Sequence, residues 1–180
     1  TQVSKSKLDD IKGIGEKTAL KIIERYEACK DYGPAYGELG SFGLTVPFIQ
    51  TLIKRYGSAD TALDKVKNNP YILADDVKGV GFRKADEIAG SVGIGKHDIK
   101  RVIAYIQFYL NDLADSTGSS YTYYDTLLDG IDEFLGTDLP QEIIDEAMQT
   151  LIDKEILWYK DEETDDGDIN TLIALRKIYE

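Results

Sequence analysis

The strongest constraint on the fold of this chain is an internal repeat built around paired glycines. Residues 11–22 and residues 77–88 follow one pattern: apolar, lysine, glycine, apolar, glycine, any residue, basic, any residue, alanine, any two residues, isoleucine. An internal repeat defines a structural unit that the chain uses more than once. The first half of the chain must therefore fold into the same local structure at two places.

Each copy predicts two short helices joined by a tight turn. Glycine adopts a positive φ without steric cost, so a Gly-x-Gly sequence can reverse the chain between two helices. Ala85 and Ile88 have the spacing of one helix face, and the first copy has the same residue types at matching positions. This is the helix-hairpin-helix pattern, in which we expect Gly15 and Gly81 to need a positive φ or a close backbone approach.

A degenerate third copy lies between the two intact ones. Residues 43–45, Gly-Leu-Thr, take the place of the turn, and residues 52–56 align with residues 22–26. Thr45 replaces the second glycine and Pro47 replaces the basic residue. We therefore interpret the middle copy as structural.

The two intact turns have the chemistry of a phosphate site. Their glycines expose backbone N–H groups at the start of the second helix, where the helix dipole adds partial positive charge. Such a site holds the DNA backbone without reading bases. The alternative is that the turns only help the helices to pack. The candidate DNA-binding residues are Lys12, Gly13, Gly15, Lys17, Lys78, Gly79, Gly81, Arg83 and Lys84.

Charge is divided unevenly along the chain, whose net charge is −12. Residues 1–101 hold 17 Lys and Arg against 14 Asp and Glu, whereas residues 102–180 hold 4 against 19. Because DNA is a dense polyanion, only the first part is suited to contact it. The acidic C-terminal half is better suited to packing or to a basic protein partner.

Residues 90–97, Gly-Ser-Val-Gly-Ile-Gly-Lys-His, resemble a nucleotide-binding P-loop but lack its essential features. His97 stands where the P-loop has a Ser or Thr that holds magnesium, and a helical pattern rather than a buried strand precedes the segment. We interpret it as a helix end at Gly90 or Gly93. The sequence shows no catalytic signature and no Cys/His metal constellation, so we expect no catalytic residue, metal or cofactor in this chain.

The second half predicts a winged-helix-like segment. Residues 99–114 form an amphipathic pattern, residues 115–120 have loop composition, and two further helices are expected over residues 125–135 and 140–154. Strands at residues 156–159 and 169–173 flank a polar turn. The last helix, which would enter a DNA groove in such domains, carries four carboxylates against one lysine. Repulsion from phosphates argues against that use.

The expected fold class is mainly α, with tandem helix-hairpin-helix motifs followed by a small winged-helix-like α+β segment. The expected domains are residues 1–32 for the first motif, residues 33–97 for the degenerate and second intact motifs, and residues 98–180 for the acidic domain. No apolar run is long enough to span a bilayer, and Cys29 is the only cysteine. Both features favour a cytoplasmic protein without membrane contact.

The run from Asn69 to Ala89, which includes Asn-Pro-Tyr and Gly-Val-Gly-Phe, resembles the region ahead of the motor in RecD-like (exonuclease V alpha subunit-like) superfamily I DNA helicases. The resemblance implies a parent enzyme that hydrolyses ATP and moves 5′ to 3′ along DNA. It also implies that ATP and magnesium bind in motor domains that lie beyond residue 180.

The resemblance favours a non-catalytic accessory region, whose partners would be single-stranded or forked DNA and the helicase motor. Two alternatives stay open. The chain could be a stand-alone helix-hairpin-helix protein of DNA repair or recombination. It could also be a protein-interaction module that does not contact DNA.

Overall fold

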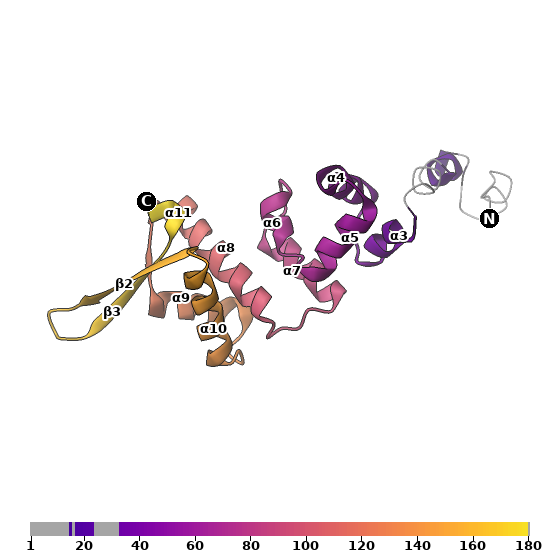
Figure 1. Cartoon of the computed structure of the whole chain (residues 1–180). Coiled ribbons are helices and arrows are strands. Elements are labelled where there is room, and N and C mark those ends of the chain that lie inside the picture. Colours follow the sequence, from indigo (N-terminus) through magenta and orange to yellow (C-terminus); the bar gives the residue numbers. More distant parts are fainter. Residues whose placement is uncertain (1–14, 16, 24–32, 180) are drawn as a thin grey trace. The chain divides into compact units, whose positions relative to one another are not determined.

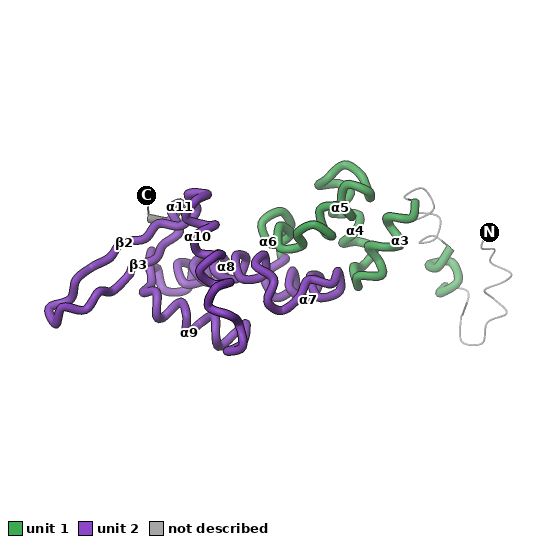
Figure 2. Tube along the Cα trace, turned by 60° about the horizontal axis from the view of Figure 1, so that its bottom comes forward, with its two compact units in different colours: residues 1–79 green, residues 80–180 purple. Residues whose placement is uncertain are grey.

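The computed structural model describes residues 15, 17–23 and 33–179. These residues are mainly helical, with one three-stranded antiparallel sheet near the C-terminus (Figure 1). The predicted fold class is confirmed. The chain divides into two compact units, residues 1–79 and residues 80–180 (Figure 2). In the described part, no helix is long and apolar enough to cross a membrane.

Unit 1 is all helical where the structure describes it. Residues 17–23 are helical, and the helices that follow are α3 (Gly33–Ser41), α4 (Val46–Tyr56), α5 (Ala59–Asn68) and α6 (Ile72–Asp76). Helix α5 packs against α3, α4 and α6. Leu39, Leu52 and Leu73 are fully buried and anchor this core.

Local sequence explains the ends of the unit 1 helices. Pro47 lies in the first turn of α4, where a missing N–H costs no hydrogen bond. Gly57 ends α4 in the left-handed conformation, with its N–H donating to the Ile53 carbonyl. Ser58 then starts α5, because its hydroxyl accepts from the Thr61 N–H. The short link between α4 and α5 therefore stops one helix and starts the next.

Unit 2 has the element order of a winged helix. It contains α7 (Phe82–Val92), α8 (Ile99–Thr117), β1 (Thr122–Tyr123), α9 (Tyr124–Leu135), α10 (Gln141–Asp153), β2 (Leu157–Glu163), β3 (Ile169–Leu175) and α11 (Arg176–Tyr179). The sheet order is β1-β3-β2, and both pairings are antiparallel. Helix α8 is central, since it packs against α7, α9, α10 and β3.

The ends of α8 follow from its capping residues. The Asp98 carboxylate accepts from the Lys100 N–H, and Gly118 ends the helix in the left-handed conformation. The helix includes Thr117, so the loop expected from residue 115 begins three residues later than predicted. The Thr117 hydroxyl donates to the Leu113 carbonyl, an interaction within the helix that composition alone did not indicate.

The wing formed by β2 and β3 is longer than predicted. Its register runs from Leu157 opposite Leu175 to Glu163 opposite Ile169, so residues 161–163 belong to a strand and not to the turn. Strand β1, which was not predicted from the sequence, adds a third strand beside β3. The root of the wing is buried and its tip is exposed.

Candidate nucleic-acid interface

In the second turn, residues 78–81, the first glycine and not the second has the conformation that favours glycine. Gly79 has φ +87°, whereas Gly81 has φ −94° and ψ 178°, which is extended backbone open to any residue. A Cβ at Gly81 would meet nothing within 4 Å. The expectation of a positive φ or close approach at Gly81 was wrong, because the reversal is made at the first glycine.

Gly81 has a different role, as the N-cap of α7. The Ala85 N–H donates to the Gly81 carbonyl at 3.1 Å, which begins the helical hydrogen-bond ladder. Backbone N–H groups in the first turn of a helix have no intrahelical acceptor. Glycine has no side chain that could accept from them, and no side-chain cap is formed here. The N-terminus of α7 therefore presents backbone donors to an anion.

Two cations lie in the first turn of α7, and both are exposed. The Arg83 guanidinium carbon lies 5.2 Å from the centre of the Phe134 ring, within cation–π range. The Lys84 ammonium lies 2.8 Å from the Glu87 carboxylate one turn later. Lys78 and Gly79, the last two residues of unit 1, are exposed as well.

An aromatic cluster fixes the first turn of α7 on the winged-helix fold. Phe82, which is 2% exposed, lies 5.4 Å from Tyr105, 5.6 Å from Phe108 and 5.6 Å from Phe134, measured between ring centres. Tyr105 donates its hydroxyl to the Gly130 carbonyl at 2.7 Å, which joins α8 to α9. Burial raises the pKa of Tyr105 to about 12.

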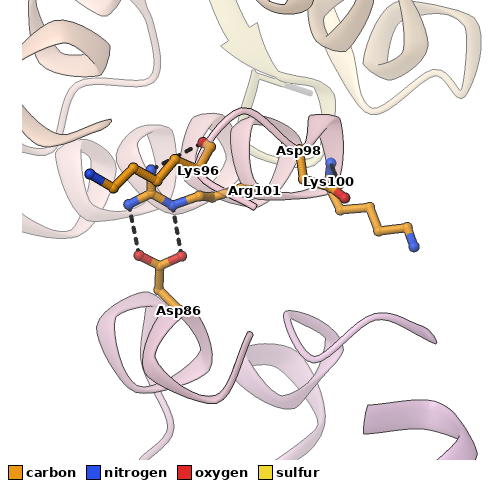
Figure 3. Close-up of polar contacts among 5 residues, drawn as sticks. All are labelled: Asp86, Lys96, Asp98, Lys100 and Arg101. Carbon is orange, nitrogen blue, oxygen red and sulfur yellow. Dashed lines mark hydrogen bonds and ion pairs between the residues drawn. The ribbon is translucent and has the colours of Figure 1, made fainter. Parts of the chain in front are cut away.

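A paired ion bridge holds α7 and α8 together beside this cluster. Arg101 Nε and Nη2 each donate to one oxygen of Asp86 at 2.9 Å, and Arg101 also donates to the Lys96 carbonyl (Figure 3). Both side chains are largely buried, at 15% and 21% exposure. In Figure 3 the Lys100 side chain extends away from this bridge. We assign the bridge a structural role, because the Arg101 guanidinium is already paired with the Asp86 carboxylate.

The first turn can be followed only in part. Gly15 accepts hydrogen bonds from the Thr18 and Ala19 N–H groups at 2.8 and 3.0 Å, so it begins the helix at residues 17–23. Gly15 does not have a positive φ, and a Cβ there would meet nothing within 4 Å. The prediction that Gly15 needs a positive φ or a close backbone approach was therefore wrong, as it was for Gly81. Lys17 is exposed in the first turn. Lys12 and Gly13 lie outside the described residues.

The middle turn has the same backbone with different chemistry. Gly43 has φ +79°, Leu44 is buried, and Thr45 is the extended N-cap of α4. Pro47 removes one N–H from the first turn, and that turn carries no basic side chain. The middle turn therefore keeps the backbone reversal but offers fewer donors and no cation to a phosphate, which agrees with its interpretation as a structural copy.

The segment that resembles a P-loop ends a helix instead. Residues 90–92 belong to α7, and Gly93 ends it with φ +96° while its N–H donates to the carbonyls of Ala89 and Gly90. Ile94 donates to Ala89 as well, which completes a typical helix terminus. His97 is exposed and its Nε2 lies 3.3 Å from an Asp138 oxygen. A helix end was predicted at Gly90 or Gly93, and the structure places it at Gly93.

The surfaces that a winged helix usually turns toward DNA are acidic here. Helix α10 exposes Glu142, Asp145, Glu146 and Asp153, and the wing exposes Asp161, Glu162, Glu163, Asp165, Asp166 and Asp168. Only Lys160 and Lys154 offset these charges on α10, the wing and the link between them. Repulsion between these carboxylates and phosphates disfavours a DNA contact at either element.

Several residues that shape the interface were not found from the sequence. Phe134 and the Asp86–Arg101 bridge join segments that are distant along the chain, so no local spacing marks them. Phe82 did have a signal, because it is a large apolar residue directly after the turn, and the structure buries it.

Two short helices joined by a glycine turn, used repeatedly and followed by a winged-helix order of elements, define a helix-hairpin-helix protein. Residues 30–121 match the family described as the HHH domain of the ATP-dependent RecD2 DNA helicase. This match covers slightly more than half of the 180 residues, and the chain belongs to that family. The resemblance drawn from residues 69–89 is thereby confirmed.

Proposed function

We propose that this chain is a non-catalytic accessory region of a DNA helicase that binds the DNA backbone without sequence preference. The family match implies a DNA-binding accessory region. The single observation that supports a particular site is the N-terminus of α7, where an uncapped glycine precedes two exposed cations. Backbone donors, the helix dipole and basic side chains at one helix end favour phosphate.

The proposed contacts are Gly81, Arg83 and Lys84 at α7, with Lys78 and Gly79 just before them. Lys12, Gly13, Gly15 and Lys17 would provide a second contact of the same kind. Backbone N–H groups and cations at a helix N-terminus favour phosphate oxygens, which carry no sequence information, so the contact would position DNA rather than select a sequence.

ATP and magnesium would bind in the motor domains of a parent helicase that moves 5′ to 3′. Residues 90–97 are an unsuitable nucleotide site, because a helix occupies the first part of this segment where a P-loop would follow a strand. The chain would thus contribute DNA binding, or packing on the motor, and leave the chemistry to another part of the enzyme.

A second candidate function is a protein-interaction module, and the exposed carboxylates of α10 and the wing favour it. A basic protein surface would complement them, whereas DNA would not. The two functions are compatible if unit 2 contacts DNA through α7 and a protein through its acidic elements.

The proposal is tested by fluorescence anisotropy of the 180-residue chain with single-stranded, duplex and forked DNA from about 20 to 200 mM salt. The variant Lys17→Ala/Arg83→Ala/Lys84→Ala should bind each DNA about tenfold more weakly at low salt, with a shallower salt dependence. The matched control is Lys54→Ala/Lys67→Ala/Lys154→Ala, which removes the same charge elsewhere.

Three outcomes distinguish the candidates. A selective loss in the first variant supports the turns as the site. Equal losses in both variants would mean that net charge alone is responsible. An absence of binding at the lowest salt would overturn the DNA contact and favour the protein-interaction module.

A further inference from the structure

Phe134 lies outside residues 30–121, which match the helicase family, and yet it contacts Phe82 and Arg83 in the first turn of α7. It belongs to α9, the helix that follows the short first strand of the winged helix. Its ring lies 5.6 Å from the ring of Phe82 and 5.0 Å from that of Tyr105. The ring position is therefore fixed from two sides by buried or largely buried aromatic neighbours.

The same ring supports the Arg83 side chain. The guanidinium carbon of Arg83 lies 5.2 Å from the ring centre, and Arg83 as a whole is exposed. A guanidinium that stacks on an aromatic face keeps its in-plane N–H donors available for a second partner. Arginine otherwise loses much rotamer freedom when it binds a phosphate, so a side chain held in advance loses less.

Lys84 provides the contrast within one helical turn. Its ammonium is paired with the Glu87 carboxylate at 2.8 Å, and both side chains are more than half exposed. A carboxylate partner competes with a phosphate for the same cation, whereas an aromatic ring does not neutralise the charge of its partner. Arg83 is thus the better prepared of the two cations.

We propose that Phe134 is a positioning residue for DNA binding, which holds the Arg83 guanidinium at the N-terminus of α7 ready for a phosphate. The inference rests on the proposed function and assigns the winged-helix segment a part in it: support for the helix-hairpin-helix contact rather than a DNA contact of its own. In this arrangement α10 and the wing need not contact DNA, so their acidic side chains are compatible with DNA binding at α7.

The test is a double-mutant cycle on the full 180-residue chain, with anisotropy of a labelled duplex oligonucleotide of arbitrary sequence at low salt. Phe134→Leu keeps an apolar side chain without the ring and should weaken binding about two- to fivefold. In an Arg83→Ala background the same substitution should leave the affinity unchanged. Phe134→Tyr, which keeps the ring, should restore wild-type affinity.

A structural readout accompanies the cycle and requires no DNA. The Arg83 side-chain protons should show upfield ring-current shifts in the NMR spectrum of the free chain. Phe134→Leu should abolish these shifts and Phe134→Tyr should retain them. Thermal melts of each variant show how far the loss of aromatic packing lowers stability.

Equal weakening by Phe134→Leu with and without Arg83 would overturn the inference, because it would indicate a general structural effect. If Phe134→Leu leaves the affinity unchanged in the chain that retains Arg83, the inference is overturned as well, while the proposed function stays intact. If the wild-type chain binds no DNA, the proposed function and this inference both fail. The two failures are therefore distinguishable.

Discussion

The middle turn and the second turn have one backbone and two chemistries. Each has a positive-φ glycine, then a buried apolar residue, then an extended N-cap: residues 43–45 in one and residues 79–81 in the other. The first helical turn then differs, with Pro47 in α4 where α7 has Arg83. The steric part of the motif can therefore persist after its charged part is gone.

The largest expected effect tests the shared backbone. Gly79→Val and Gly43→Val should each lower the free energy of unfolding by about 2 kcal/mol, since a β-branched residue is strained at positive φ. Gly81→Val should cost less than about 0.5 kcal/mol, because its backbone is extended and its surroundings are open. Urea unfolding measures all three. A larger loss at Gly81 than at Gly79 would contradict the turn geometry.

A somewhat smaller effect on stability is expected from the residues at matching positions of α7 and α4. Asp86→Asn should lower the free energy of unfolding by about 1.5 kcal/mol, since it weakens a largely buried bidentate pair with Arg101. The matching position in α4 is Gln50, which is exposed, so Gln50→Ala should change stability by less than about 0.5 kcal/mol. Chemical denaturation compares them, and equal losses would refute a special anchor at α7.

Asp76, at the end of the helix that precedes the second turn, should make the stability of the protein depend on pH. The Arg55 guanidinium donates to one Asp76 oxygen at 2.6 Å, and the Tyr56 hydroxyl donates to the other at 2.8 Å. These hydrogen bonds lower the pKa of Asp76. The stabilisation is present above the unfolded-state pKa of the carboxyl and is lost as pH falls through its lower folded value.

Between neutral pH and the folded-state pKa of Asp76, this loss should amount to about 1 kcal/mol, because Arg55 is half exposed. Asp76→Asn should remove that part of the acid sensitivity. Asp75→Asn, at an exposed neighbour, is the matched control. Urea unfolding at a series of pH values would show parallel curves for Asp76→Asn and wild type if the network contributes nothing.

The smallest expected effect comes from restoring the phosphate-binding groups that the middle turn lacks. Pro47→Arg returns both a backbone N–H and a cation to the first turn of α4, and should tighten DNA binding by about twofold with a steeper salt dependence. Pro47→Ala returns the N–H alone and serves as the control. If anisotropy shows the same change for both variants, the added charge has no specific role.

The sequence predicted the repeated turns well because their requirements are local. A glycine pair, an alanine and an isoleucine at helical spacing suffice to place α7 and its buried face. The same locality explains the error at Gly81. The two glycines of a Gly-x-Gly turn look equivalent in a sequence, whereas Thr45 in the middle turn shows that the second position accepts a side chain.

The long-range parts of the site were not predictable in this way. Tyr105 is buried in α8, and the acceptor of its hydroxyl is the Gly130 carbonyl in another helix, so no local spacing marks this role. Phe134 gained its place only when α9 packed against α8. Strand β1 is two residues long and exists through its pairing with β3.

The position of Trp158 gives this protein a built-in optical reporter. It is the only tryptophan in the chain and lies in β2, half-buried opposite Ala174 in unit 2. Emission excited selectively at the indole band therefore follows unit 2 alone, while far-ultraviolet circular dichroism follows the helices of both units. A substitution such as Gly43→Val would shift the dichroism transition ahead of the indole transition wherever unit 1 unfolds by itself. The two signals would coincide wherever both units unfold as one.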